Sequence, residues 1–342
     1  MNMIKKVKIS VVIPAYNASK YIKECLQSLS AQTCKDWEAV IVNDGSTDNT
    51  AEICESFAKN DNRFRIINKS NEGANYARRD GVLKSCGGYI ASIDSDDVVA
   101  PWYLSVLYDY LINNGADIAS CKYRQSLPFK EYPKQAEYKI YKGKNNIIQA
   151  FLADGLQGNF YSTLSKRELF SDIDWKFSNR HYDECAYLMI QLYSKAKTAV
   201  SIDVKPYYYR TVLNSLSKNI EYSCGSGKIS NSFELVKKTK DDWTDYFRGI
   251  NVDMPKQLAA RNLSSFLAIL SVAVDAKYSS DKIREFINYT IKEYKSNFGK
   301  EYWSQRSKFL LLVLRFGGEF SFRLYRKTVF LIKWVLVKIN RI

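Results

Sequence analysis

The sequence predicts an α/β fold in which an open, mostly parallel β-sheet carries helices on both faces. Short apolar runs that favour strands alternate with amphipathic segments that favour helices, at about 25–30 residues per pair. The run from Val7 to Pro14 is rich in β-branched residues without polar alternation, as is typical of a central strand buried on both faces. Because crossovers between parallel strands are right-handed, such a series folds into an open sheet with helices on either side.

The elements follow in order from this alternation. Ser19 is a predicted N-cap for the first helix and Ser46 or Thr47 for the second, while Gly87-Gly88 ends the third. The predicted strands are residues 7–14, 37–43, 64–67, 89–93 and 117–121, and the predicted helices are residues 19–31, 46–58, 74–86 and 101–113.

Three carboxylates, Asp94, Asp96 and Asp97, follow the apolar run Tyr89 to Ile93 within four residues. Burying like charges together costs several kcal/mol unless a cation compensates, so we expect this cluster at a strand end that a cation can enter. Oxygen ligands alone suit Mg²⁺ or Mn²⁺. The alternative is a solvated acidic turn that precedes the next helix, with Pro101 at its first position.

The ends of the other strands favour the metal hypothesis. In open parallel sheets the carboxyl ends of the strands meet at one crevice, where ligands bind. The first turn, Pro14 to Lys20, contains no glycine, although a dinucleotide-binding fold needs G-x-G-x-x-G there. A nucleotide diphosphate would therefore need a metal on the acidic cluster. The converging segments are Pro14-Ala15-Tyr16, Asn43-Asp44, Asn68-Lys69 and Asp94-Ser95-Asp96.

Four sequence blocks carry a family resemblance, in matching order and spacing. They are VVIPAYNASKYIKECLQSLSAQT, VNDGSTDNT, NKSNEGANYARRDG and GGYIASIDSDD. Over residues 1–125 the chain closely resembles family 2 glycosyltransferases of the GT-A fold. The resemblance implies an inverting, metal-dependent transfer of a sugar from a nucleotide-diphosphate sugar, chiefly a UDP-sugar. The acceptor would be a hydroxyl of a glycan or lipid-linked glycan in bacterial surface-polysaccharide synthesis, and the cofactor Mn²⁺ or Mg²⁺.

The resemblance also implies roles for individual residues. Pro14, Ala15 and Tyr16 would line the nucleoside pocket, and Asp44 would accept a hydrogen bond from the base, or cap a turn, or both. Arg78 would lie near the base or the phosphates. Asp94, next to Ser95 in the donor site, would reach the ribose or the metal, Asp96 would bind the metal, and Asp97 would support both. The family usually has Asn where Arg79 stands, which could alter phosphate contacts.

The expected domain division places a glycosyltransferase domain at residues 1–215 and a helical extension at residues 216–342. Residues 1–125 would bind the nucleotide-sugar and residues 126–215 the acceptor, with a variable loop or edge region at residues 125–144. Many relatives place Glu-Asp at the start of a later helix, with the Asp as base. Here the order is reversed, Asp183-Glu184, so the base is one of these two residues, or the pair is only a favourable helix N-terminus.

The net charge of +15 is uneven, because residues 1–120 are slightly acidic. The excess gathers toward the C-terminus, where residues 303–342 interleave basic, aromatic and apolar side chains. This pattern is typical of an interfacial helix on an anionic membrane, or of a helix packed on protein. Since the N-terminus is polar and no run approaches the ~20 apolar residues of a membrane span, we expect a cytoplasmic protein, peripheral at the inner face of the plasma membrane.

Other function classes fit less well. A nucleotidyltransferase would need a Gly- and Arg/Lys-rich loop after the first strand, which the sequence lacks. A non-enzymatic protein that binds nucleic acid or another anion would explain the charge, but the charge lies in an apolar tail without a base-reading motif, so we expect no nucleic-acid partner. A single histidine, His181, and seven scattered cysteines disfavour His-based catalysis and zinc sites. Oligomeric association remains possible.

Overall fold

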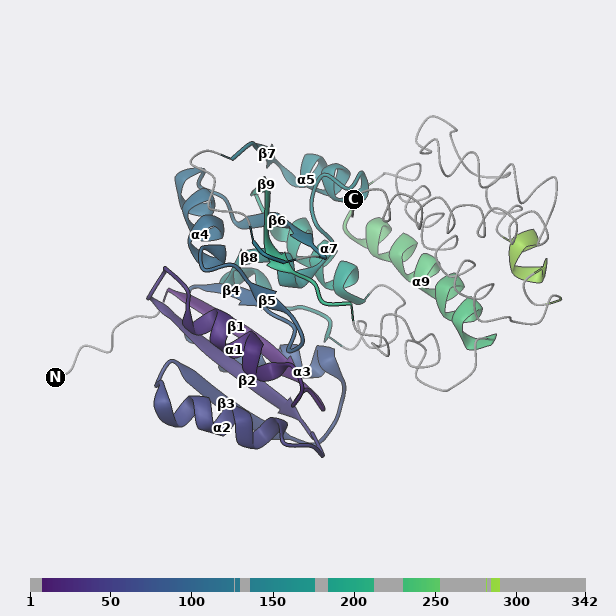
Figure 1. The fold of residues 1–342 in the computed structure, drawn as a ribbon. Coiled ribbons are helices and arrows are strands. Elements are labelled where there is room, and N and C mark those ends of the chain that lie inside the picture. Colours follow the sequence, from purple (N-terminus) through teal and green to yellow (C-terminus); the bar gives the residue numbers. More distant parts are fainter. Residues whose placement is uncertain are drawn as a thin grey trace, which may run out of the picture. The chain divides into compact units, whose positions relative to one another are not determined.

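The computed structural model describes residues 8–125, 127–129, 136–175, 184–211, 230–252, 281 and 284–289 (Figure 1). The chain clusters into two compact units, Met1–Leu213 and Asn214–Ile342, and each is described by itself. Within the described residues, no helix is long and apolar enough to cross a membrane.

The first unit is built on one sheet with the strand order β3-β2-β1-β4-β8-β6-β9-β5, and β7 also pairs with β9. The strands β1, β2, β3, β4, β6 and β9 point one way, and β5, β7 and β8 run against them. The strands are β1 (Ile9–Ala15), β2 (Trp37–Asp44), β3 (Phe64–Lys69), β4 (Tyr89–Ser92), β5 (Val98–Val99), β6 (Ile118–Arg124), β7 (Tyr138–Lys142), β8 (Thr163–Lys166) and β9 (Thr198–Tyr208). The α-helices are α1 (Ile22–Ser30), α2 (Thr50–Asn60), α3 (Ala74–Lys84), α4 (Tyr103–Asn113), α5 (Lys144–Leu152) and α7 (Glu184–Lys195), with short 3₁₀ turns at Phe160–Ser162 and Arg167–Phe170. The predicted α/β fold with an open, mostly parallel sheet is confirmed.

Alternate residues of β2 show how both faces of the sheet are covered. Ala39 and Ile41 belong to the main core, which also takes the apolar residues of α1 and α4. Val40 and Val42 point to the opposite face and pack with Ala77 of α3. Because side chains alternate along a strand, an uninterrupted apolar run is what a sheet with helices on both faces requires.

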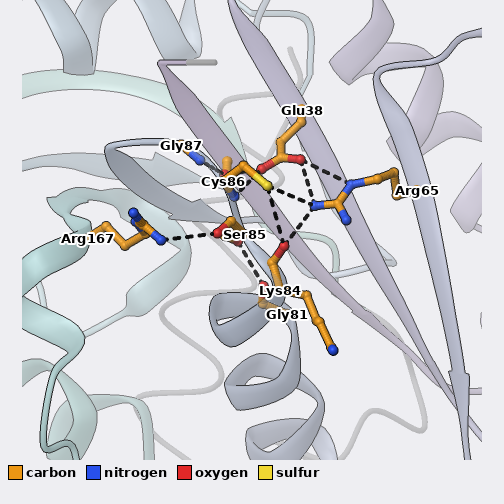
Figure 2. Close-up of polar contacts among 9 residues, drawn as sticks. Glu38, Arg65, Gly81, Lys84, Ser85, Cys86, Gly87 and Arg167 are labelled. Carbon is orange, nitrogen blue, oxygen red and sulfur yellow. Dashed lines mark hydrogen bonds and ion pairs between the residues drawn. The ribbon is translucent and has the colours of Figure 1, made fainter. Parts of the chain in front are cut away.

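A polar network around the buried Glu38 lies at the amino end of the first strands (Figure 2). Glu38 accepts hydrogen bonds from the Ser10 hydroxyl and the Cys86 amide, both at 2.6 Å, and from Arg65 Nη2 at 2.7 Å. Arg65 also donates to the carbonyl of Lys84. Burial alone would raise the pKa of Glu38, but these hydrogen bonds outweigh it and hold the pKa below its ordinary value. The network therefore fixes the turn that leads from α3 into β4.

The structure corrects the predicted helix caps. Helix α1 begins at Ile22 and α2 at Thr50, and no side chain caps either. Ser19 instead donates its amide to the carboxylate of Asp48, and the Ala18 amide donates to the Thr50 hydroxyl at 2.8 Å. These polar side chains tie the first two strand-to-helix loops together, a tertiary role that outweighs the local capping preference.

The sequence pattern does not predict the short strands, because their conformation depends on pairing with other strands and not on local hydrophobic periodicity. The two-residue strand β5 follows the acidic cluster and pairs with the end of β9. Within the segment predicted as a loop or edge region, Tyr138–Lys142 forms β7, which pairs antiparallel with β9. Strand β8 inserts antiparallel between β4 and β6, so the sheet is mixed beyond β4.

The described part of the second unit is helical. Helix α9 spans Ser230–Gly249, and Trp243 and Phe247 are buried on one side of it. Their rings pack 6.1 Å apart, and the four-residue spacing places them on one helix face. The described residues of this unit thus agree with the predicted helical extension.

Gly87 and Gly88 provide a test of the packing in the turn that leads into β4. A Cβ on Gly87 would lie 2.7 Å from the Ser10 backbone nitrogen, whereas on Gly88 the nearest heavy atom is 4.0 Å away. We expect Gly87→Ala to lower the free energy of unfolding by about 1–3 kcal/mol through overpacking, and Gly88→Ala to leave it nearly unchanged. Urea unfolding measures both. Equal effects at the two positions would contradict the packing described here.

Candidate functional site

The carboxyl ends of the first four strands lie at one edge of the sheet, as predicted. In the register, Ala15 pairs with Asn43 and Asp44 with Lys69, while β4 ends opposite Val12, two residues before Asp94. The Asn43 side-chain nitrogen Nδ2 donates to Asn68 Oδ1 at 2.8 Å. The loops after β1 and β2 are also joined: the Asn17 amide donates to the Ser46 hydroxyl, and Asn17 Oδ1 accepts from the Thr47 amide. This edge is therefore braced by polar side chains.

Asp44 is buried and holds the start of α3. Its two carboxylate oxygens accept hydrogen bonds from the backbone amides of Glu72 at 3.0 Å and Gly73 at 2.8 Å. Gly73 has a φ of 100°, a conformation that favours glycine. Asp44 thus caps this turn, as one of its two predicted roles requires. Each carboxylate oxygen also retains a lone pair for a further hydrogen-bond donor.

The residues at the end of β1 differ in exposure. Pro14 and Ala15 are buried, so they shape the floor of the edge with their backbone. Tyr16 is 52% exposed, which leaves its ring accessible to a ligand. Of the three predicted nucleoside contacts, Tyr16 is the one that presents a large surface.

Arg78 reaches the acidic cluster from α3. Its Nη2 donates to Asp94 Oδ1 at 2.7 Å, and its Nη1 donates to Asn75 Oδ1 at 3.1 Å. The Arg78 side chain is largely buried, so this ion pair lies in a medium where charge attraction is strong. Its neighbour Arg79 turns elsewhere, to Asp80 Oδ1 at 2.7 Å and over the ring of Tyr76.

The acidic cluster accumulates negative charge in a partly buried turn. Burial and the charge of Asp94 raise the pKa of Asp96 to about 6. Burial, with Asp94 and Asp96, raises the pKa of Asp97 to about 8, although the Tyr207 hydroxyl and the Arg210 amide oppose the rise. The half-buried Asp94, Ser95 and Asp96 form the accessible part of the turn, while Asp97 is buried. The turn therefore favours the approach of a cation.

The end of β9 and the residues after it contribute two side chains, Tyr207 and Arg210, that no sequence motif assigns to the site. The Tyr207 hydroxyl donates to Asp97 Oδ2 at 2.6 Å, and Arg210 Nε donates to the Asp96 carbonyl at 2.7 Å. Arg210 also pairs with Glu24 on α1 at 2.6 Å. The need for positive charge near three carboxylates points to an arginine, but Arg210 lies 114 residues from Asp96, and no spacing rule selects it.

The carboxylate oxygens of Asp94 and Asp96 fit a divalent cation whose remaining ligands would be phosphate oxygens and water. Within the described residues, no group of three or more His, Cys, Asp or Glu side chains is arranged to hold a metal alone. Mg²⁺ sites in nucleotide-dependent enzymes commonly use one or two carboxylates plus substrate phosphates and water. The raised pKa of Asp96 agrees with coordination of this kind, because a bound cation would relieve the repulsion between the Asp94 and Asp96 carboxylates.

The predicted base lies at the limit of the described chain. Asp183 and His181 are outside the described residues. Glu184 begins α7, which packs against α5, but its side chain is not among those described. The assignment of the base to Asp183 or Glu184 therefore stays a prediction.

Comparison with known proteins gives consistent matches. The model of the family "Glycosyl transferase family 2" matches residues 10–173. Glycosyltransferase GlyG of Streptococcus pneumoniae is 30% identical over 226 residues, which cover 61% of this chain and 73% of GlyG. Glycosyltransferase GlyA of the same organism is 31% identical over 225 residues, 62% of this chain. The matched segment spans only 32% of GlyA, so GlyA is much the longer protein.

Solved structures share the fold. The TarS fragment 1–349 of S. aureus in complex with UDP-GlcNAc has a TM-score of 0.60 at 17% identity, covering 94% of this chain and 91% of that chain. The mannosyltransferase PcManGT of Pyrobaculum calidifontis, in complex with GDP-Man and Mn²⁺, has a TM-score of 0.52 at 12% identity, covering 95% and 85%. At such identities the likeness concerns the fold alone.

The charge accumulation has a measurable effect on stability. The pKa of Asp96 is about 6 in the folded state, against about 3.9 in an unfolded chain, so the wild type loses stability as the pH rises through about 6. We expect Asp96→Asn to stabilise the metal-free protein by about 1–2 kcal/mol near pH 8 and by little near pH 4.

Asp44→Asn is the matched control, because the Asp44 carboxylate receives two amide hydrogen bonds. It should destabilise the protein by about 1–3 kcal/mol near pH 8. Urea unfolding across the pH range compares the two variants. An Asp96→Asn variant that is less stable than the wild type at high pH would refute the account of the acidic turn.

Proposed function

The chain belongs to glycosyl transferase family 2, and on that premise we propose that it is an inverting, metal-dependent glycosyltransferase. It moves a sugar from a nucleotide-diphosphate sugar, a UDP-sugar, to a hydroxyl of a glycan or lipid-linked glycan. The observation that carries the proposal is the acidic turn Asp94–Asp97 at the carboxyl end of β4, faced by Arg78 at the edge where the other strands end.

The donor site that we propose extends along this edge. Tyr16 offers an exposed aromatic ring to the nucleoside, with Pro14 and Ala15 as the floor beneath it. Asp44 is already oriented by two backbone amides and retains acceptor capacity for an N–H of the base. Arg78 and Ser95 lie beside Asp94, at the part of the edge that we assign to the ribose and the diphosphate.

Asp94 and Asp96 would hold Mn²⁺ or Mg²⁺ together with the diphosphate. When bound, the cation supplies Lewis-acid stabilisation of the leaving diphosphate, which needs no protonated side chain. Arg78 adds positive charge at the same place, and its ion pair with Asp94 keeps both side chains oriented before the donor arrives. Support comes from PcManGT, which has the same fold and whose structure contains GDP-Man and Mn²⁺.

Transfer requires a base that takes the proton of the acceptor hydroxyl. We propose Asp183 or Glu184 for this role, at the start of α7. A base on the side of the sugar opposite the diphosphate allows a single in-line displacement, which inverts the anomeric centre. Helix α7 packs through Tyr193, in its last turn, against Phe151 of α5, and both helices belong to the proposed acceptor half, residues 126–215.

The remaining expectations belong to the same proposal. The acceptor would be built in surface-polysaccharide synthesis, at the inner face of the plasma membrane, with the protein in the cytoplasm. Residues 216–342 form the extension, whose basic tail, residues 303–342, would contact anionic lipid; this tail lies outside the described residues. We propose no nucleic-acid partner and leave association between copies open. Neither a nucleotidyltransferase nor an anion-binding protein gains support from the family matches.

A donor screen tests the reaction. With Mn²⁺ present, we expect one or a few nucleotide sugars to be hydrolysed slowly and UDP to raise the Tm. Asp96→Ala should lower the rate by at least about 100-fold and cancel the effect of UDP on Tm, because the diphosphate charge is no longer met. Mass spectrometry of the released nucleotide follows the reaction. If no nucleotide or nucleotide sugar raises the Tm with metal present, the proposal fails.

The base is assigned by two single substitutions, Asp183→Asn and Glu184→Gln. The variant of the true base should bind UDP and Mn²⁺ as the wild type does and lose about 10²–10⁴-fold in transfer. The other variant serves as its control. Wild-type transfer rates in both would refute the assignment of the base to this pair.

Deletion of residues 303–342 tests the membrane contact. We expect the full chain to sediment with vesicles that contain anionic phosphatidylglycerol, less so at high salt, and the shortened chain to stay in solution. Neutral phosphatidylcholine vesicles are the control. Unchanged sedimentation of the shortened chain would show that other residues make the contact.

A further inference from the structure

We propose that Tyr207 is a positioning residue for the acidic turn: its hydroxyl links the backbone of Asp94 to the carboxylate of Asp97, which sets the directions in which Asp94 and Asp96 face the donor and the metal. The inference rests on the proposed function, in which the acidic turn binds a cation together with the diphosphate of the donor.

The hydrogen bonds form one continuous chain. The Asp94 amide donates to the Tyr207 hydroxyl oxygen at 3.1 Å, and the hydroxyl donates its own proton to Asp97 Oδ2 at 2.6 Å. Asp97 Oδ1 accepts the Arg210 amide at 2.7 Å. Asp97 thus directs both oxygens to protein donors on β9 and the residues after it. Its part is to anchor the turn, which leaves metal binding to Asp94 and Asp96.

The ring of Tyr207 cannot shift easily. It is completely buried, lies stacked on Tyr161 with centroids 4.6 Å apart, and meets Tyr103 edge-on at 6.0 Å. Its backbone pairs with Val99 of β5, the strand that directly follows the turn. The turn is therefore enclosed between β4 and β5, and β9 holds it through both the backbone ladder and the Tyr207 hydroxyl.

This placement matters because the turn is under repulsion. Asp94, Asp96 and Asp97 lie within four residues, and without a fixed backbone the carboxylates would move apart toward water. A fixed turn keeps the two accessible carboxylates close before the cation binds, so less order has to be imposed during binding. A hydroxyl suits this role, since it accepts from an amide and donates to a carboxylate at once.

Tyr207→Phe keeps the packed ring and removes both hydrogen bonds. In the metal-free protein, we expect the Asp94 amide to exchange with deuterium at least about fivefold faster, because its acceptor is gone. We also expect the Mn²⁺ concentration that half-saturates the UDP-induced rise in Tm to increase by about 10- to 100-fold. The first measurement requires neither metal nor activity.

Tyr103→Phe is the matched control. It removes a buried hydroxyl from the same aromatic cluster, one that donates to the Tyr161 carbonyl at 2.7 Å and does not touch the acidic turn. We expect Tyr103→Phe to lower Tm about as much as Tyr207→Phe does. The Asp94 exchange rate and the Mn²⁺ midpoint should stay at wild-type values. Equal changes in the two variants would overturn the inference, since they would show general loosening of the core.

The outcomes separate the two proposals. A wild type whose Tm no nucleotide or nucleotide sugar raises in the presence of Mn²⁺ would overturn the proposed function. A wild type that responds, with Tyr207→Phe unchanged in exchange and midpoint, would overturn this inference alone. If Tyr207→Phe does not fold, Asp97→Asn carries the test, because its amide cannot accept from both Tyr207 and Arg210. A wild-type Mn²⁺ midpoint in Asp97→Asn would then overturn the inference, whereas the Asp94 exchange rate does not decide in this variant because the Tyr207 acceptor remains.

Discussion

The like charges at the end of β4 are the constraint on which the site depends. Burial and mutual repulsion raise the pKa of Asp96 and Asp97, so the turn exists only because other elements supply opposite charge and hydrogen bonds. Arg78 arrives from α3 and Arg210 from the end of β9, and each contacts a different part of the turn. These contacts compensate part of the charge, and the remainder favours a divalent cation.

The two edges of the sheet differ in how far their carboxylate charges are compensated. At the amino edge, Glu38 is fully engaged by Ser10, Arg65 and the Cys86 amide, and the pKa of its carboxyl is lowered (Figure 2). At the carboxyl edge the pKa of Asp96 is raised, which marks an acid whose charge is not fully met. Perturbation of that kind at the carboxyl ends of parallel strands is typical of ligand sites.

Asp44 and Asp97 are two buried carboxylates that position other parts of the candidate site. Asp44 orients α3 through the Glu72 and Gly73 amides, and α3 carries Arg78 to the acidic turn. Asp97 accepts from Tyr207 and from the Arg210 amide, and so connects the turn to the last strand of the sheet. Both residues act mainly by placing other side chains.

Local periodicity and contiguous motifs encode the strand and helix alternation, the burial of β1 and β2, the acidic cluster and the family, so these features can be predicted from the sequence. Other features emerge from the three-dimensional fold: the Ser19 amide binds Asp48 in the next loop and does not cap α1, β8 inserts antiparallel beside β4, and Tyr207 and Arg210 complete the acidic turn. The physical reason is range: capping, pairing partners and charge compensation depend on residues far apart in the chain, and no local pattern specifies which of several candidates the fold brings near.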